Sequence, residues 1–69
     1  MTGTEFKVLR QSTGLTQQQL ANQARVSVSL IRKLECGTAD IGNIAAKNLI
    51  AISAALDVDP RTLIEKAED

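Results

Sequence analysis

Two short amphipathic helical patterns stand almost end to end between Thr16 and Gly37, and this spacing constrains the fold more than any other feature of the chain. Thr16 and Gln19 have the spacing of a capping box, and apolar residues then recur at helical intervals. Ser27 offers a fresh N-cap for the second pattern, which ends at Gly37. Because only about three or four residues separate the patterns, the two helices must cross steeply and share one small core.

This spacing defines a helix-turn-helix unit, in which the outer face of the second helix projects into solvent. A projecting helix of this width fits the major groove of B-DNA, where base edges present distinguishable donors and acceptors. Arg32 and Lys33 add positive charge to the second helix, which favours an anionic partner. The alternative is that the two residues belong to an ordinary solvated face.

Capping signals and apolar periodicity predict three further helices around this pair. The helix from Asn43 is apolar on most sides, which predicts a central, buried position, and Asn43 is expected to cap it. Asp59 followed by Pro60 marks the start of the last helix. We therefore predict an all-α fold, a single domain over residues 1–69, with five helices at about 3–13, 16–24, 27–36, 43–56 and 60–67.

The composition excludes several classes of protein. The chain has no histidine and one cysteine, Cys36, so a four-ligand zinc site and an internal disulfide are not expected. No nucleophile–base pair and no phosphate-cradling glycine loop stand out, and Cys36 is expected to be an inert cap position. We predict no enzyme activity, no cofactor and no small-molecule ligand. Without a leader or a long apolar stretch, we expect a cytoplasmic protein that makes no use of a membrane.

Charge is distributed unevenly although the net charge is zero. Residues 1–47 contain six basic against three acidic residues, a net charge of +3. Residues 48–69 contain two basic against five acidic residues, a net charge of −3. Such polarity favours one face for an anionic partner and another face turned away from it. The alternative, a chance distribution of solvated charges, remains open because the numbers are small.

The segment GLTQQQLANQARVSVSLIRKLECG, residues 14–37, resembles the helix-turn-helix core of the Cro/repressor family, the xenobiotic response element type of bacterial and phage transcription factors. The segment LIAISAALDVD, residues 49–59, together with Leu63 and Ile64, resembles the fourth and fifth helices of that family. The similarity covers about residues 5–65. It implies a sequence-specific DNA-binding transcriptional regulator, with a repressor as the expected type.

The resemblance also implies which residues meet DNA. Arg32 could hold guanine O6 and N7 bidentately, and Lys33 suits a phosphate better than a base. Neutral amides at a helix N-terminus can donate to phosphate, although Gln17 could equally be ordinary helix surface. The residues expected at base edges or adjoining phosphates are Val28, Ser29, Arg32 and Lys33. The residues expected at backbone phosphates are Gln17, Gln18, Asn43 and Lys47.

Two further family positions bear on stability. The resemblance implies that Arg10 and Glu35 pair across the first helix and the end of the third as a structural clamp. Many relatives have glycine where this chain has Arg25, and a left-handed conformation there would cost arginine about 1 kcal/mol. The loop 38–43 also lacks the basic residues that relatives often carry, so we expect modest non-specific affinity and a shallow salt dependence.

A chain this small contacts few bases, which favours a homodimer on a palindromic operator with half-sites roughly 34 Å apart. A core of this size also supplies only about 3–5 kcal/mol, so a partner subunit would add stability. The expected dimer seam uses whichever of Val58, Leu63 and Ile64 the core leaves exposed. The alternative function is a protein-interaction or antitoxin-like adaptor of the same fold, which the neutral net charge favours and the exposed basic pair disfavours.

Overall fold

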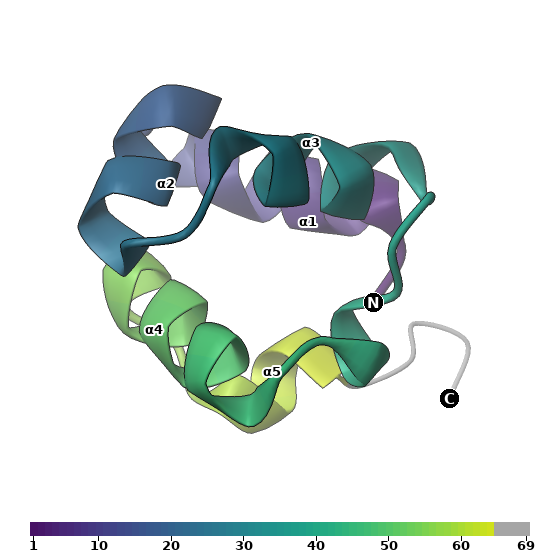
Figure 1. Ribbon diagram of the computed structural model, residues 1–69. Helices are drawn as coiled ribbons and strands as arrows, with labels where there is room; N and C mark the ends of the chain where they lie inside the picture. Colours follow the sequence, from purple (N-terminus) through teal and green to yellow (C-terminus); the bar gives the residue numbers. More distant parts are fainter. Residues whose placement is uncertain (65–69) are drawn as a thin grey trace.

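The fold is built from helices alone throughout residues 1–64, which are the residues that this computed structural model describes (Figure 1). The all-α prediction and the order of the five predicted helices are confirmed, with a short 3-10 helix, η1, added before the fourth. The end of the predicted helix 60–67 lies outside the described residues. The elements are α1 (Gly3–Ser12), α2 (Gln17–Ala24), α3 (Val28–Cys36), η1 (Ile41–Asn43), α4 (Ala46–Leu56) and α5 (Pro60–Ile64).

Local hydrogen bonds explain where the first three helices begin. Thr16 is the N-cap of α2, its hydroxyl accepts from the Gln19 backbone N–H, and the Gln19 side chain bonds back to the Thr16 N–H. α1 has the same reciprocal box, between Thr2 and Glu5. Ser27 caps α3 through a bond from the Leu30 N–H. Each cap bonds to backbone N–H groups of the first turn that have no partner within the helix. Because the partners are three residues apart, the sequence alone predicts these starts.

The core lies where the helices meet. α3 packs against both α1 and α2, α2 also packs against α4, and α4 packs against α5. Figure 1 shows α1 and α3 side by side on one side of the molecule, with α4 and α5 on the other. The buried apolar residues form one cluster of Phe6, Leu20, Ala21, Ala24, Ile31, Leu34, Ile41, Ile52, Leu56 and Leu63.

Gly3 allows the start of α1 to approach the end of α3 closely. A Cβ built on Gly3 would lie 2.8 Å from the backbone oxygen of Leu34 and would also collide with the carbonyl of Glu35. Both obstacles are backbone atoms, which cannot swing aside as a side chain can. The contact therefore depends on glycine for space, and it helps to set the position of α3 on the body of the domain.

The start of α4 differs from the prediction. Asn43 does not cap it; Asn43 ends η1, whose N-cap Asp40 accepts from the Gly42 N–H at 3.0 Å. α4 begins at Ala46, and its N-cap position, Ala45, offers no side-chain hydrogen bond. Asp40 thus caps a turn earlier in the loop. As a result, α4 begins two residues later than it would if Asn43 were its N-cap.

The expected burial of α4 is also only partly right. Ile52 and Leu56 are buried, but Ile50 is 58% exposed. The physical reason is the small number of helices: α4 packs mainly against α2 and α5, so one of its apolar faces has no cover. An apolar sequence pattern indicates a preference for burial, and a chain this short cannot satisfy the preference on every side.

The turn between α2 and α3 takes the left-handed conformation that the family pattern suggested. Arg25 has φ 58° and ψ 41°, and its N–H bonds to the carbonyl oxygens of Ala21 and Asn22. This geometry caps α2, and the Cβ of arginine is crowded in it, at a cost of about 1 kcal/mol. The turn therefore keeps the shape that glycine would favour, with the strain retained.

Candidate nucleic-acid interface

The outer face of α3 is open to solvent. Ser29, Arg32 and Lys33 are exposed, whereas Ile31 and Leu34 are buried in the core. The helical repeat explains this division into exposed and buried residues, because side chains three and four positions apart share a face. Two positive charges and a hydroxyl thus project from a helix whose opposite side is anchored.

Val28 is less available than the sequence suggested. It is half-buried and packs against the core cluster. Val28 lies three residues before Ile31, which places it at the edge of the buried face of α3. Only part of its side chain remains for contact with a partner.

The first turn of α2 lies beside α3. Gln17 is half-buried, and its Nε2 donates to Glu35 Oε1 at 3.0 Å. Gln18 is exposed, and its Nε2 donates to Asn22 Oδ1 at 2.9 Å, within the same helix. An amide nitrogen carries two N–H groups, so each bond leaves a second donor on the same nitrogen. The amide of Gln17 is held in position by α3, and that of Gln18 is not.

Glu35 joins three parts of the unit. Its Oε2 lies 2.5 Å from Arg10 Nε, and the two side chains are 5% and 9% exposed. The Arg10 guanidinium also donates to Glu35 Oε1 at 3.3 Å and to the carbonyl oxygen of Leu15 at 2.7 Å. With the bond from Gln17, the carboxylate ties α1, the start of α2 and the end of α3 together. The sequence indicated the Arg10–Glu35 pair but not the attachment of Gln17.

Asn43 and Lys47 are exposed, in η1 and in the first turn of α4 respectively. Within residues 1–64, no hydrogen bond joins either side chain to the side chains of α3. Asn43 lies in the turn that Asp40 caps by accepting from the Gly42 N–H.

The residues of the expected dimer seam separate into two groups. Leu63 is fully buried in the core, so it is not among the residues that the core leaves exposed. Val58 is half-buried against the core, and Ile64 is 46% exposed. Ile50, for which the apolar pattern of α4 predicts burial, is a further exposed apolar residue. Periodicity alone could not reveal it, since it depends on which face of α4 finds a partner helix.

Cys36 lies at the end of α3 and is exposed. Its Sγ lies 3.1 Å from the Thr38 hydroxyl, and the hydrogen bonds from Thr38 lower the pKa of the thiol below its usual value. These hydrogen bonds favour the thiolate form of the exposed sulfur.

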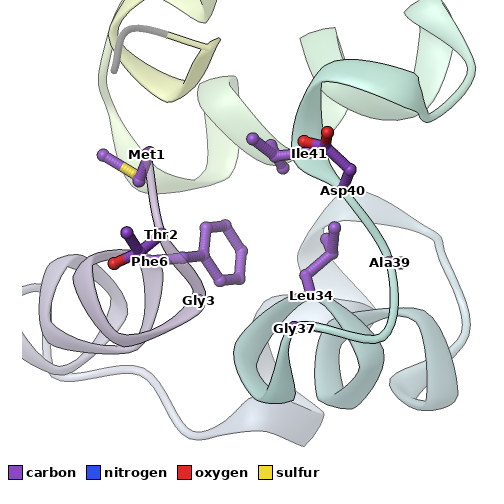
Figure 2. A pocket seen from close by; sticks show the side chains of 9 residues that line it. All are labelled: Met1, Thr2, Gly3, Phe6, Leu34, Gly37, Ala39, Asp40 and Ile41. Atoms are coloured by element: carbon purple, nitrogen blue, oxygen red, sulfur yellow. The ribbon is translucent and has the colours of Figure 1, made fainter. Parts of the chain in front are cut away.

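A hollow of about 260 Å³ opens beside the N-terminus (Figure 2). In Figure 2, Phe6, Leu34 and Ile41 point toward one another from α1, α3 and η1, and Met1 lies above Phe6, level with Ile41. These side chains belong to the core or lie against it. The hollow is thus the edge of the core where the N-terminal segment and η1 close over it.

Within residues 1–64, no three acidic, histidine or cysteine side chains gather where they could hold a metal ion. None of the described helices has the length and apolar character needed to cross a bilayer.

The fold and this surface define the class of protein: a helix-turn-helix domain with an exposed basic recognition helix, the architecture of DNA-binding regulators. A helix-turn-helix family model matches residues 6–63. The chain belongs to this family, the Cro/C1-type helix-turn-helix transcriptional regulators. The resemblance seen in the sequence is thereby confirmed.

Solved structures of DNA-binding and controller proteins are similar to this fold. The restriction-modification controller protein C.AhdI from Aeromonas hydrophila is 31% identical over 88% of each chain, with a TM-score of 0.76. The N-terminal DNA-binding domain of SinR from Bacillus subtilis is 28% identical over 97% of this chain and 94% of that chain, with a TM-score of 0.82. A solution structure of that SinR domain, from a master biofilm regulator, is 29% identical over 100% and 97%, with a TM-score of 0.79. No curated protein sequence matched.

Proposed function

We propose that the protein is a repressor that binds a palindromic operator as a homodimer, with α3 of each subunit in the major groove. The observation that carries the proposal is the exposed face of α3, which bears Ser29, Arg32 and Lys33 while its inner face is fixed in the core. The controller function of C.AhdI and the DNA-binding role of the SinR domain support it by similarity. Such a protein acts in the cytoplasm, where the DNA of a bacterium lies.

Base reading falls to the exposed residues of α3 and to the free edge of Val28. Ser29 can accept from or donate to more than one base, and the methyl groups of Val28 can touch a thymine methyl. Arg32 and Lys33 supply longer, charged donors for base edges or adjoining phosphates.

Backbone phosphates on either side of the groove are assigned to two groups of neutral or basic donors. At the start of α2, Gln17 offers its second amide N–H, and Gln18 lies next to it. At the end of η1 and in the first turn of α4, respectively, Asn43 and Lys47 are exposed. Because only Lys47 in these two groups carries a charge, few counterions are released, and we expect a shallow dependence of affinity on salt.

The dimer seam is assigned to Val58 and Ile64 with Ile50 as an additional apolar residue. Ile50 and Ile64 are 58% and 46% exposed, which solubility of a single subunit does not favour. Burial of these side chains would add stability to a domain whose own core is small.

Selection of bound duplexes from a random DNA pool, at two salt concentrations, tests the proposal. A palindromic sequence enriched at both concentrations would support it. Retention without sequence preference, or no retention, would favour the adaptor function, which the zero net charge and the lack of a basic residue in the loop 38–43 suggest. Light scattering of the protein with and without the selected duplex then reports whether two subunits bind.

A further inference from the structure

An open hollow of about 470 Å³ lies between α1 and α3, next to the start of α2. It is lined by Lys7, Gln17, Arg32, Glu35 and Cys36, so all three helices contribute. The sequence pattern alone indicates no role for Lys7. Lys7 and Arg32 are both exposed at this hollow, one from each of the two neighbouring helices.

The charges at the hollow do not cancel. The carboxylate of Glu35 is occupied by the buried guanidinium of Arg10 and by the amide of Gln17. Among residues 1–64, neither Lys7 nor Arg32 forms an ion pair with a carboxylate. Because Arg10 neutralises Glu35 from the buried side, Lys7 and Arg32 leave two uncompensated positive charges at the hollow. Two cations that face the same space repel each other, and an anion placed between them removes the repulsion.

The direction of Arg32 matters for its role. Residues three and four positions apart share a helix face, which places Arg32 with Glu35 and Cys36 on the side of α3 that borders the hollow. Ser29 and Lys33 are one turn apart and occupy the neighbouring stripe, and Lys33 does not line the hollow. Arg32 therefore leans toward α1 and α2, the side on which the backbone contacts of Gln17 are expected.

We propose that this hollow holds one phosphate of the DNA backbone, bound jointly by Lys7 from α1 and Arg32 from α3. The inference rests on the proposed function and deepens it, because it moves Arg32 from base reading to backbone contact. Base reading by the exposed side chains of α3 then falls to Lys33 and Ser29. A phosphate contact carries no sequence information, so loss of either cation weakens all duplexes alike.

The test measures fluorescence anisotropy of a labelled operator and of a scrambled duplex over a series of salt concentrations. For Lys7→Ala and for Arg32→Ala we expect affinity for both duplexes to fall by the same factor, about three- to tenfold near 0.1 M salt. Each variant should reduce the steepness of the logarithmic salt dependence by up to about 0.9, the value for one phosphate. The double variant should reduce it by no more than that, because the two cations share one phosphate. Arg61→Ala, which removes a positive charge from α5, is the matched control and should leave the steepness unchanged.

A second measurement uses operator duplexes in which a single phosphate, at a different position in each duplex, is replaced by a neutral methylphosphonate. The affinity of each duplex is then measured. At the phosphate in question, wild type and Lys7→Ala should bind equally. Altered preference for a single base pair in Arg32→Ala would overturn the inference, as would a Lys7→Ala variant that behaves like Arg61→Ala. In both cases the wild type still binds its operator, and the proposed function stands. A wild type that binds no duplex would overturn both. Circular dichroism confirms that each variant is folded.

Discussion

The carboxylate of Glu35 lies against the guanidinium of Arg10, with 2.5 Å between Oε2 and Nε, at a site where both side chains are less than one-tenth exposed. The pair connects the first helix to the last turn of α3 and, through Gln17, to the first turn of α2. A buried ion pair of this kind is a weak source of net stability, but loss of one partner leaves a charge without compensation. Its position makes it a determinant of how α3 is presented.

Arg10→Ala should lower the melting temperature far more than Arg32→Ala. An unpaired buried carboxylate costs about 3–5 kcal/mol, whereas Arg32 is exposed and contributes little to folding. Operator binding should show the reverse order. Thermal denaturation and anisotropy measure the two effects. The double variant Arg10→Met with Glu35→Leu should recover much of the lost stability, because no charge is then buried. Equal thermal shifts for Arg10→Ala and Arg32→Ala would contradict this division of roles.

Gly3→Ala should destabilise the domain by about 1–3 kcal/mol, the usual range for an added group in a space without room. The new Cβ would lie 2.8 Å from the Leu34 backbone oxygen, so α1 and α3 must separate. Gly42→Ala is a matched control, since its Cβ would meet only the Asp40 side chain, at 3.6 Å. Chemical denaturation compares the two variants, and equal midpoints would show that α1 and α3 have more freedom at this contact than the structure indicates.

Arg25→Gly should stabilise the protein by up to about 1 kcal/mol, because glycine adopts the left-handed conformation without crowding. The greater freedom of glycine in the unfolded chain offsets part of the gain. Arg25→Ala removes the same charge but keeps the Cβ, so it should show no such gain. The comparison of unfolding free energies separates backbone strain from charge. A gain shared by both variants would assign the effect to the charge instead.

The pH dependence of thiol alkylation should reveal the bond between Cys36 and Thr38. Hydrogen bonds from Thr38 stabilise the thiolate and lower the pKa of Cys36, so the wild type should react with iodoacetamide at a lower pH than an ordinary cysteine does. Thr38→Val removes the hydroxyl bond, and the midpoint of the rate against pH should move upward. Thr4→Val, at an exposed position of α1, serves as a control. An unchanged midpoint in Thr38→Val would mean that the bond does not persist in solution.

Ile64→Ser should weaken association of two subunits without unfolding either one, because the side chain is 46% exposed. Leu63→Ser should instead unfold the domain or destabilise it by about 3 kcal/mol, since Leu63 is completely buried. Sedimentation at several concentrations measures association, and circular dichroism measures folding. Association that Ile64→Ser leaves intact would remove this part of α5 from the dimer seam.

Local sequence was sufficient for the helices and for most of their starts. Thr16 with Gln19 and Ser27 with Leu30 interact across three residues, so the sequence alone brings the partners together. The same reasoning failed at Asn43, where two capping residues compete and Asp40 shapes the loop first. Helical spacing also predicted the exposed face of α3, because the apolar residues that the core buries recur on the opposite face.

The sequence by itself determined an all-helical domain, the helix-turn-helix unit and the resemblance that identifies its family. Only the tertiary structure decided that Leu63 is interior and Ile50 exterior, that Gln17 bonds to Glu35, and that Lys7 and Arg32 line the same hollow. The physical reason is the separation along the chain between the residues that interact. Caps and helical faces depend on residues three or four positions apart, whereas burial and contacts between helices depend on which faces find a neighbour in space.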